Sequence, residues 1–491
     1  MVKSAMNGTR RVLASAVLVG MLAGCAVGPD FRRPEPPDAS TYLPGAQPSG
    51  TVAAKGPGGT KQRFEPGPDI PSEWWSLFRS GPLDRRIRVA LEANPTLAQA
   101  RARLAQAREE LNARAGAAQY PAVNAGISAA RQKLNPASLG VPNVPEPGPF
   151  TLYNASISVS YALDLFGGNR RALEGLGAKV DYREFELEAA RRTLAANVVN
   201  ASIRQASLRA RIGIARDLLE AQGRQFAITE DRYKAGGVSA LDVRNQNMLL
   251  DQTRALLPPL EGQLARITHQ LAVYMGREPA DAPIDAFDLD ALHLPGEVPI
   301  RLPSSLARKR PDIRAAEALW HQACANVGVA TADLFPRITL SGSLGSQRTG
   351  SGDLPAGVNV WSIAGNLMQP IFRGGELRAR KRSAVAAYDE AAAVYRHTVL
   401  QGLQEVADTL SALDMDARTL QARADAAEHA RAGYEIARQQ YLLGGISHLA
   451  LLDARRQLLQ SAFDRVLAQA DRYADTAALL HALGGGWRDL E

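Results

Sequence analysis

Histidine and cysteine are common metal ligands and catalytic groups, and both are scarce in this chain. The chain of 491 residues has 7 histidines and 2 cysteines. The histidines are scattered over His269, His293, His321, His397, His429, His448 and His481. The sequence contains no H-E-x-x-H, no G-x-S-x-G and no dinucleotide-binding glycine pattern after a predicted strand. We therefore expect no metal site, no cofactor and no enzyme activity.

Cys25 is the residue whose surroundings indicate a covalent modification. A positively charged start and the apolar stretch 12–22 precede it, and the run 22–25 reads Leu-Ala-Gly-Cys. An apolar helix of that length spans about 16 Å, too short for a bilayer core of about 30 Å, so residues 1–24 are predicted to be a signal peptide. An ordinary signal peptide is the alternative, but the run matches the bacterial lipobox. We predict S-diacylglycerol and an N-acyl chain on Cys25, and because Ala26 is not acidic, delivery to the outer membrane.

The other cysteine, Cys324, lies in a predicted helix and is expected to be a small, buried, unpaired side chain. The formal net charge of +7 is modest for this length, and aromatic residues do not alternate with the basic runs. We therefore expect no nucleic-acid partner.

Proline distribution predicts two very long helices. No proline occurs between residues 150 and 257 or after residue 370. Both tracts are rich in Ala, Leu, Arg, Gln and Glu, which favour helix, so we predict helices at 169–235 and 376–443. At 1.5 Å per residue each would be about 100 Å long. Small residues at helical spacing, such as Val198 and Ala201, suit helices packed side by side around a hollow.

Four segments of about ten residues alternate apolar and small polar residues. They are predicted as strands at about 121–134, 151–164, 336–348 and 357–369. A soluble sheet covering a core would show the same alternation, but the lipobox and the hydroxyl-rich polar face favour membrane strands. Four strands cannot close a barrel and an open edge is not tolerated in lipid, so the sequence predicts oligomerisation.

The helices and strands occur twice, in the same order. The clearest paired landmarks are the tip turns 236–239 and 444–447, each beginning Gly-Gly and ending in Ser, with a tyrosine three residues before the first glycine. We predict that these turns contact a partner protein through Tyr233, Gly236, Gly237, Val238, Ser239, Tyr441, Gly444, Gly445, Ile446 and Ser447. The glycines would supply positive φ, and the two serines would cap the returning helices.

Charged residues close to the tips are candidates for a gate. They are Glu230, Asp231, Arg232, Glu435 and Arg438. Repeated around a symmetric channel, such charges would form rings that select ions. The alternative, which the sequence supports equally well, is that these charges face outward into solvent and have no role in gating.

Together these features resemble the outer membrane efflux protein family, the TolC-like outer membrane factors, in their lipoprotein (NodT/OprM-type) branch. The resemblance covers nearly all of the mature chain. Its motifs are the lipobox followed by Val27-Gly28-Pro29-Asp30-Phe31, then Asn94-Pro95-x-Leu97, Leu302-Pro303-Ser304, Arg310-Pro311-Asp312-Ile313 and Phe335-Pro336. One departure is that both tips read Gly-Gly where the family pattern has a single glycine.

The resemblance implies an α+β membrane protein. Each chain of a homotrimer would contribute four transmembrane strands to a 12-stranded β-barrel in the outer membrane, continued by a long periplasmic α-helical barrel. The predicted parts are a signal peptide (1–24), a lipidated tether with the start of an equatorial region (25–83), repeat 1 (84–257), an equatorial linker where Pro258-Pro259 breaks the helix (258–303), repeat 2 (304–476) and a C-terminal equatorial segment (477–491).

By the same resemblance, the partners are a periplasmic adaptor (membrane fusion protein), an inner-membrane pump and outer-membrane lipid. The implied function is the exit duct of a tripartite (RND-type) efflux pump that passively conducts drugs or other small toxic molecules and is gated at the helix tips. Two alternatives stay open: the exit duct of a type I protein secretion system, and a periplasm-spanning structural lipoprotein that forms no channel.

Overall fold

The structure is a computed structural model that describes residues 26–45, 48–66, 70–136, 140, 145, 148–281, 288–349 and 357–484. The predicted signal peptide and Cys25 lie outside the described residues. The chain forms two compact units. The first takes the described residues of Met1–Arg33, Leu104–Arg183 and Ala316–Tyr395; the second takes those of Pro34–Arg103, Glu184–Ala315 and Arg396–Glu491.

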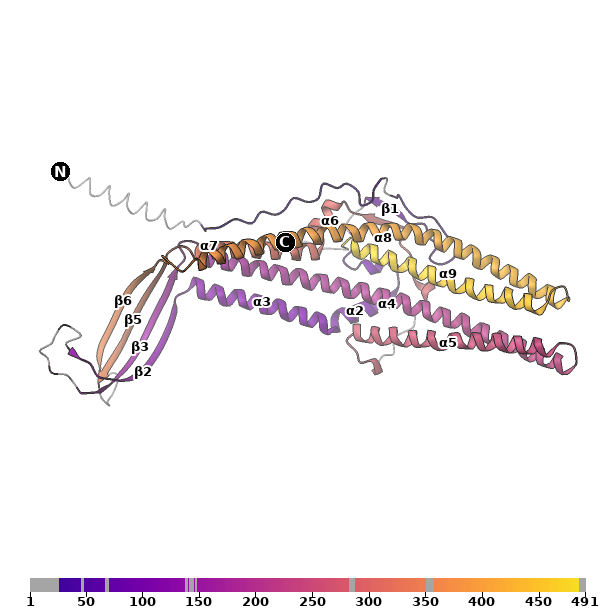
Figure 1. Cartoon of the computed structure of the whole chain (residues 1–491), viewed down its shortest axis with the longest axis horizontal. Helices are drawn as coiled ribbons and strands as arrows, with labels where there is room; N and C mark the ends of the chain where they lie inside the picture. Colours follow the sequence, from indigo (N-terminus) through magenta and orange to yellow (C-terminus); the bar gives the residue numbers. More distant parts are fainter. Residues whose placement is uncertain are drawn as a thin grey trace. The chain divides into compact units, whose positions relative to one another are not determined.

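The first unit contains an antiparallel sheet of four strands in the order β2-β3-β5-β6 (Figure 1). The strands are β2 (Ala122–Gln132), β3 (Phe150–Leu163), β5 (Arg337–Thr349) and β6 (Val358–Met368). Each lies where alternating apolar and polar residues predict a strand. The central pair, β3 and β5, joins two segments far apart in the sequence.

The register of the sheet places apolar residues opposite apolar residues and polar residues opposite polar residues. One row across the four strands reads Ala125, Ile157, Leu344 and Trp361, and the next reads Asn124, Ser158, Ser343 and Ser362. Because successive side chains of a strand point to opposite faces, the first row lies on an apolar face and the second on a polar one. The hydroxyls of Ser343 and Ser362 are 2.8 Å apart on the polar face.

Four helices contribute residues to both units: α3 (Pro95–Gln119), α4 (Gly168–Lys234), α7 (Pro311–Ala332) and α8 (Glu376–Leu442). The two long ones, α4 and α8, have 67 residues each. Their bounds differ by at most one residue from the ranges that the proline-free tracts predict. No helix in the described part of the chain is long and apolar enough for a bilayer span.

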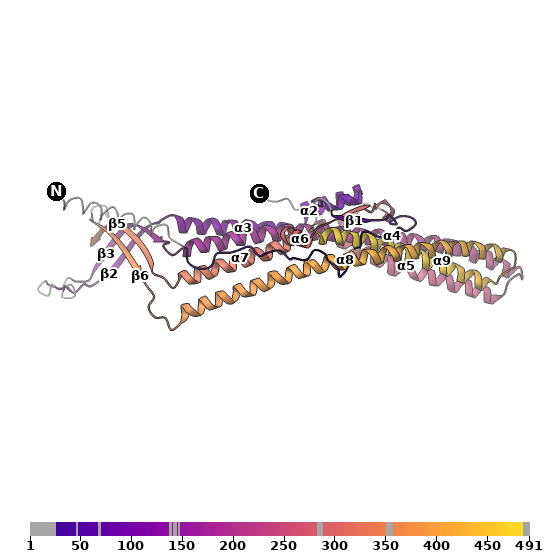
Figure 2. The same ribbon diagram turned by 90° about the horizontal axis from the view of Figure 1, so that it is seen from above.

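In the second unit the chain reverses direction after each long helix. α5 (Ala240–Tyr274) returns along α4 and α9 (His448–Ala482) returns along α8, as both views show (Figures 1 and 2). Small and branched side chains of α4, among them Ala195, Val198, Val199 and Ile203, are buried in the resulting core.

The predicted helix break at Pro258-Pro259 is wrong, because α5 contains both prolines and continues to Tyr274. A proline inside a helix removes a hydrogen bond and costs about 3 kcal/mol. Leu260 is buried directly after the pair, in a cluster with Leu208 and Ile212 of α4. Packing against α4 therefore offsets the local cost, and the predicted boundary between repeat 1 and the linker at 257/258 falls inside a helix. The boundary predicted at 476/477 likewise falls inside α9.

The segment 25–83, predicted as a lipidated tether and the start of an equatorial region, belongs to the core in its second half. β1 (Arg63–Pro66) pairs in parallel with β4 (Glu297–Ile300). Ile70, in the glycine- and proline-rich part, is almost fully buried, and so are Trp74 and Phe78 after it. Burial of these apolar side chains stabilises a defined conformation where the composition up to about residue 72 predicts an extended tether.

Short elements complete the second unit. They are η1 (Trp74–Phe78), α2 (Gly81–Ala93), η3 (Pro279–Asp281), η4 (Leu289–Ala291) and α6 (Pro303–Lys309). α2 is amphipathic and buries Leu83, Ile87 and Ala90. They pack with Leu271, at the end of α5, and Leu480, at the end of α9, in one core.

Candidate functional site: a two-faced sheet, an anchored segment and two tip turns

The apolar face of the four-stranded sheet is uncovered. Ile127, Trp361 and Ile363 are 79%, 73% and 83% exposed. Monomeric soluble proteins rarely expose a contiguous apolar patch of this kind, which indicates a face that contacts lipid or another protein. In the described residues β2 and β6 each pair on one side only, so the sheet has two open edges.

Aromatic side chains lie where the strands meet the helices of the first unit. Phe166, which follows β3, stacks on Phe335, which precedes β5, with ring centroids 4.7 Å apart. Phe372, which follows β6, is 88% exposed. Aromatic girdles of this kind flank the apolar band of membrane barrels.

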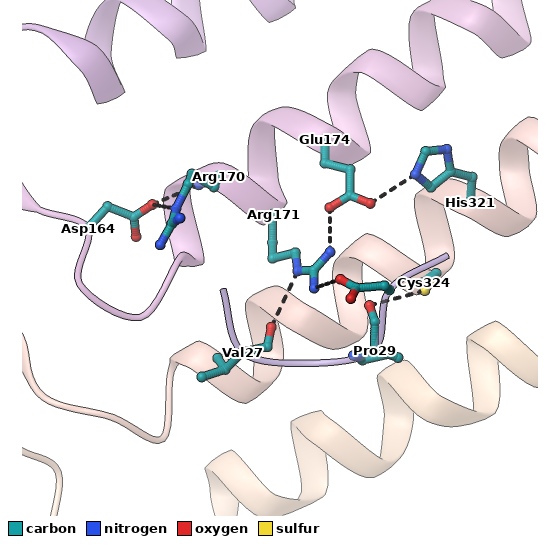
Figure 3. Close-up of polar contacts among 9 residues, drawn as sticks. Val27, Pro29, Asp164, Arg170, Arg171, Glu174, His321 and Cys324 are labelled. Carbon is teal, nitrogen blue, oxygen red and sulfur yellow. Dashed lines mark hydrogen bonds and ion pairs between the residues drawn. The ribbon is translucent and has the colours of Figure 1, made fainter. Parts of the chain in front are cut away.

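The segment that directly follows Cys25 is held against α4 and α7 (Figure 3). The Val27 amide donates to the Phe166 carbonyl at 3.1 Å. Arg171 of α4 donates through Nη2 to Asp30 Oδ1 at 2.6 Å and through Nε to the Val27 carbonyl at 3.4 Å. Residues 27–30 are thereby fixed beside the junction of β3 and α4.

Glycines permit this close approach. Gly28 has φ 99°, and a Cβ on it would lie 2.5 Å from the Cα of Gly328 in α7. A Cβ on Gly328 would in turn lie 2.7 Å from Arg171 Cγ, and one on Gly167 would lie 2.6 Å from Ala26 Cα. Side chains at these positions would clash with the segment or with the residues that it packs against.

Arg171 connects the anchored segment to a larger polar cluster (Figure 3). Its Nη1 donates to Glu174 Oε2 at 2.8 Å, and the other oxygen of Glu174 lies 2.9 Å from His321 Nε2. His321 also stacks on Phe31, with ring centroids 4.5 Å apart. The sequence motifs contain Asp30 but give no sign of Arg171 or Glu174, because these partners are more than a hundred positions away from Asp30.

Cys324 is buried and unpaired, as its helical context predicts. Its Sγ donates to the Pro29 carbonyl at 3.5 Å, so the anchored segment covers it. Burial raises the pKa of the thiol, and the charge of Glu174 raises it further. A protonated, covered thiol is unreactive.

The first tip turn joins α4 to α5. The Gly236 amide donates to the Tyr233 carbonyl and the Gly237 amide to the Arg232 carbonyl, which is the Schellman pattern of helix termination. Gly236 has φ 77°, whereas Gly237 is not in the left-handed region. The expected positive φ is therefore confined to the first glycine of the pair.

Ser239 caps α5, as predicted. Its hydroxyl accepts from the Asp242 amide at 3.2 Å, and the Asp242 carboxylate accepts from the Ser239 amide at 3.0 Å. Hydrogen bonds from Ser239 lower the pKa of Asp242. The turn is thus held by hydrogen bonds both at the end of α4 and at the start of α5.

The second tip turn, between α8 and α9, has the same construction. The Gly444 amide donates to the Tyr441 carbonyl and the Gly445 amide to the Gln440 carbonyl, with φ 77° at Gly444. The Ser447 hydroxyl accepts from the Ala450 amide at 3.2 Å. The next residue, His448, is buried with its ring 5.3 Å from that of Tyr441, and burial lowers its pKa.

The candidate gate charges form local pairs on their own helices. On α4, Lys234 lies 3.9 Å from Glu230 and 3.6 Å from Asp231. On α8, Arg438 lies 3.4 Å from Glu435. In the part of the chain that the structure describes, no ion pair joins the α4 set to the α8 set, so a role in gating stays a prediction.

The chain is similar in sequence to known proteins. The family model described as Outer membrane efflux protein matches residues 87–277 and 302–485. The chain is 31% identical to the toluene efflux pump outer membrane protein TtgF of Pseudomonas putida, over 97% of each chain. It is also 31% identical to the pyoverdine export outer membrane protein OpmQ of Pseudomonas aeruginosa, over 85% of this chain and 88% of that protein.

Among solved structures, the chain is similar to the outer-membrane channel OprN. The TM-score is 0.81 with 32% sequence identity, covering 94% of this chain and 100% of the OprN chain. The similarity thus extends to the spatial arrangement of the chain.

Proposed function

Because this chain belongs to the outer membrane efflux protein family, we propose that it is the outer-membrane exit duct of a tripartite, RND-type efflux pump. It passively conducts small toxic molecules from the periplasm to the exterior and catalyses no reaction. TtgF and OpmQ are named for the efflux of toluene and the export of pyoverdine, which supports a cargo of small molecules.

The two-faced sheet is the observation that carries this proposal. Its exposed apolar face suits lipid and its hydroxyl-rich face suits a water-filled lumen. The open edges of β2 and β6 need partners in a bilayer, because an unpaired strand edge costs several kcal/mol per exposed backbone group. Three copies joined through these edges close the barrel.

The anchored segment gives the lipid a defined position. Ala26, the residue after the lipidated Cys25, packs against Gly167 at the junction of β3 and α4. Acyl chains on Cys25 therefore enter the membrane beside the strands that cross it. Residues 27–30 act as a short, fixed link rather than a loose tether.

The two tip turns are the proposed contact with the periplasmic adaptor. Each is stiffened by a Schellman turn and a serine cap, and each leaves apolar side chains at its rim, with Leu241 67% and Leu443 86% exposed. Exposed apolar side chains on a rigid turn suit a partner that binds without reordering the loop.

Adjacent residues of β6 provide the test, because Ile363 and Ser362 point to opposite faces. Ile363→Arg puts a charge on the apolar face and is expected to cost about 2–4 kcal/mol if that face contacts lipid. Ser362→Arg, on the polar face, should still insert. We expect Ile363→Arg to give no single-channel conductance in planar bilayers, because its strands do not insert, and Ser362→Arg to conduct with an altered single-channel conductance. Equal loss of conductance in both, or wild-type protein without conductance steps, would contradict an aqueous duct.

The gate charges need a separate measurement. Asp231→Ala removes a charge close to the first tip and leaves Glu230 to pair with Lys234. If these charges control opening, conductance and drug resistance change; if they do not, the variant behaves like the wild type.

A further inference from the structure

A cavity between α4, α8 and α9 in the second unit is not used by the function described so far. Its volume is ≈ 380 Å³, within the range of small-molecule sites. Ile214 and Leu218 of α4 and Leu458 and Leu459 of α9 form apolar walls. The cavity is therefore suited to the apolar body of a ligand.

The charge around this cavity is unbalanced. Three arginines line it, Arg431 and Arg455 and Arg465, against a single carboxylate, Asp217. Two nearby carboxylates do not correct the imbalance, because Glu220 and Glu435 are already paired with Arg224 and Arg438.

Arg455 is the residue that most clearly indicates an anionic ligand. It is only 6% exposed, and its Nε has no hydrogen-bond partner among the described residues. The guanidinium lies over the ring of Tyr434, whose centroid is 5.9 Å from Cζ. Burial lowers the pKa of Arg455, and the charges of Arg224 and Arg438 lower it further against the opposing effect of Tyr434. A buried guanidinium without a carboxylate is strongly unfavourable, and an anion in the adjoining cavity would relieve it.

We propose that this cavity binds a small amphiphilic anion, with one carboxylate-like group paired to Arg455 and an apolar body between α4 and α9. This site is separate from the proposed duct and does not depend on it. A ligand there would touch both helical hairpins of one chain and hold them together.

Decanoate is a suitable probe, and decanol is its uncharged analogue. Binding is measured by equilibrium dialysis on the full-length protein in a neutral maltoside detergent. We expect saturable binding of decanoate and at least ~10-fold weaker binding of decanol, since a charged hydrogen bond contributes about 1.5–3 kcal/mol. Equal affinity for both, or no saturable binding, would overturn the proposal.

Three variants separate the contribution of the Arg455 charge to binding from that of the apolar cavity. Arg455→Met should weaken decanoate at least ~10-fold and leave decanol unchanged. Ala462→Leu, which fills the cavity, should weaken both. Arg456→Met is the matched control, because the neighbouring Arg456 is exposed and pairs with Asp453 at 2.7 Å; it should bind like the wild type.

Thermal unfolding without ligand excludes a purely structural role. Removal of a buried, unpaired charge leaves stability unchanged or raises it. We therefore expect Arg455→Met to melt no lower than the wild type and to gain less from decanoate. A lower melting temperature without ligand would mean that contacts within the protein, including any from a neighbouring copy, already stabilise the Arg455 side chain, and the proposal would fail.

Discussion

Gly28 packs directly on Gly328: a Cβ on Gly28 would lie 2.5 Å from the Cα of Gly328. This contact brings Pro29 over Cys324, whose Sγ reaches the Pro29 carbonyl. The buried thiol is therefore a natural reporter of whether the anchored segment is in place.

Gly28→Ala should release that segment. Alanine both meets the Gly328 backbone and is strained at φ 99°. We expect alkylation of Cys324 by maleimide to accelerate by about 10-fold, because thiol reactivity follows exposure and thiolate character. Mass spectrometry of the peptide containing Cys324 gives the rate. Gly45→Ala is the control: Gly45 also has positive φ, but an added Cβ meets nothing within 4 Å. The same acceleration in both variants would show that the effect is not local.

The two glycines of each tip turn should differ in how well they tolerate substitution by alanine. Gly236→Ala and Gly444→Ala place a Cβ at φ 77° and should cost about 1–2 kcal/mol in their turns. Gly237→Ala creates only an ordinary contact at 3.5 Å with the Arg232 carbonyl, so it should be tolerated. Hydrogen exchange of the tip amides measures the difference, and drug resistance of the cells shows whether function follows. Faster exchange in Gly237→Ala than in Gly236→Ala would contradict the assignment of the Schellman turns.

Features determined by local sequence were predictable. The bounds of α4 and α8 follow from helix-favouring tracts without proline, and the strands follow from strict alternation, because in both cases local preference and packing agree. The tip turns were predictable for the same reason, since Gly236 and Ser239 act within a few residues of themselves.

Features that depend on distant residues were not predictable. Pro258 and Pro259 remain helical because α4 supplies apolar contacts, which the local rule for proline does not include. Ile70 is buried in a segment whose composition suggests a linker. Arg171 acquires its role from Asp30, 141 positions earlier, and no motif links the two. Such partners are recognisable only once the fold brings them together.

The prolines of α5 give a further prediction. Because the helix already continues through them, replacing both Pro258 and Pro259 by alanine restores backbone donors without changing the path of the chain. We expect higher stability, with a melting temperature raised by several degrees. Circular dichroism melting measures it, with Pro279→Ala, outside the long helices, as the control. A lower melting temperature for the double variant would mean that the prolines impose a bend on which the packing of α5 depends.

Asp416 should make stability depend on pH. Burial, together with Asp475 and Asp471 on α9, raises its pKa from 3.8 to about 7, against the opposing charge of Arg472. Between these two values the folded chain binds more protons than the unfolded chain, so stability is highest at the acid end and falls as pH rises toward 7. Asp416→Asn removes this loss and should raise the melting temperature by about 3 °C at pH 8, with little change at pH 4.5. Asp414→Asn is the control, because Asp414 lies on the same helix and is paired with Arg418 at 2.9 Å. A pH profile of Asp416→Asn parallel to that of the wild type would assign the dependence to other groups.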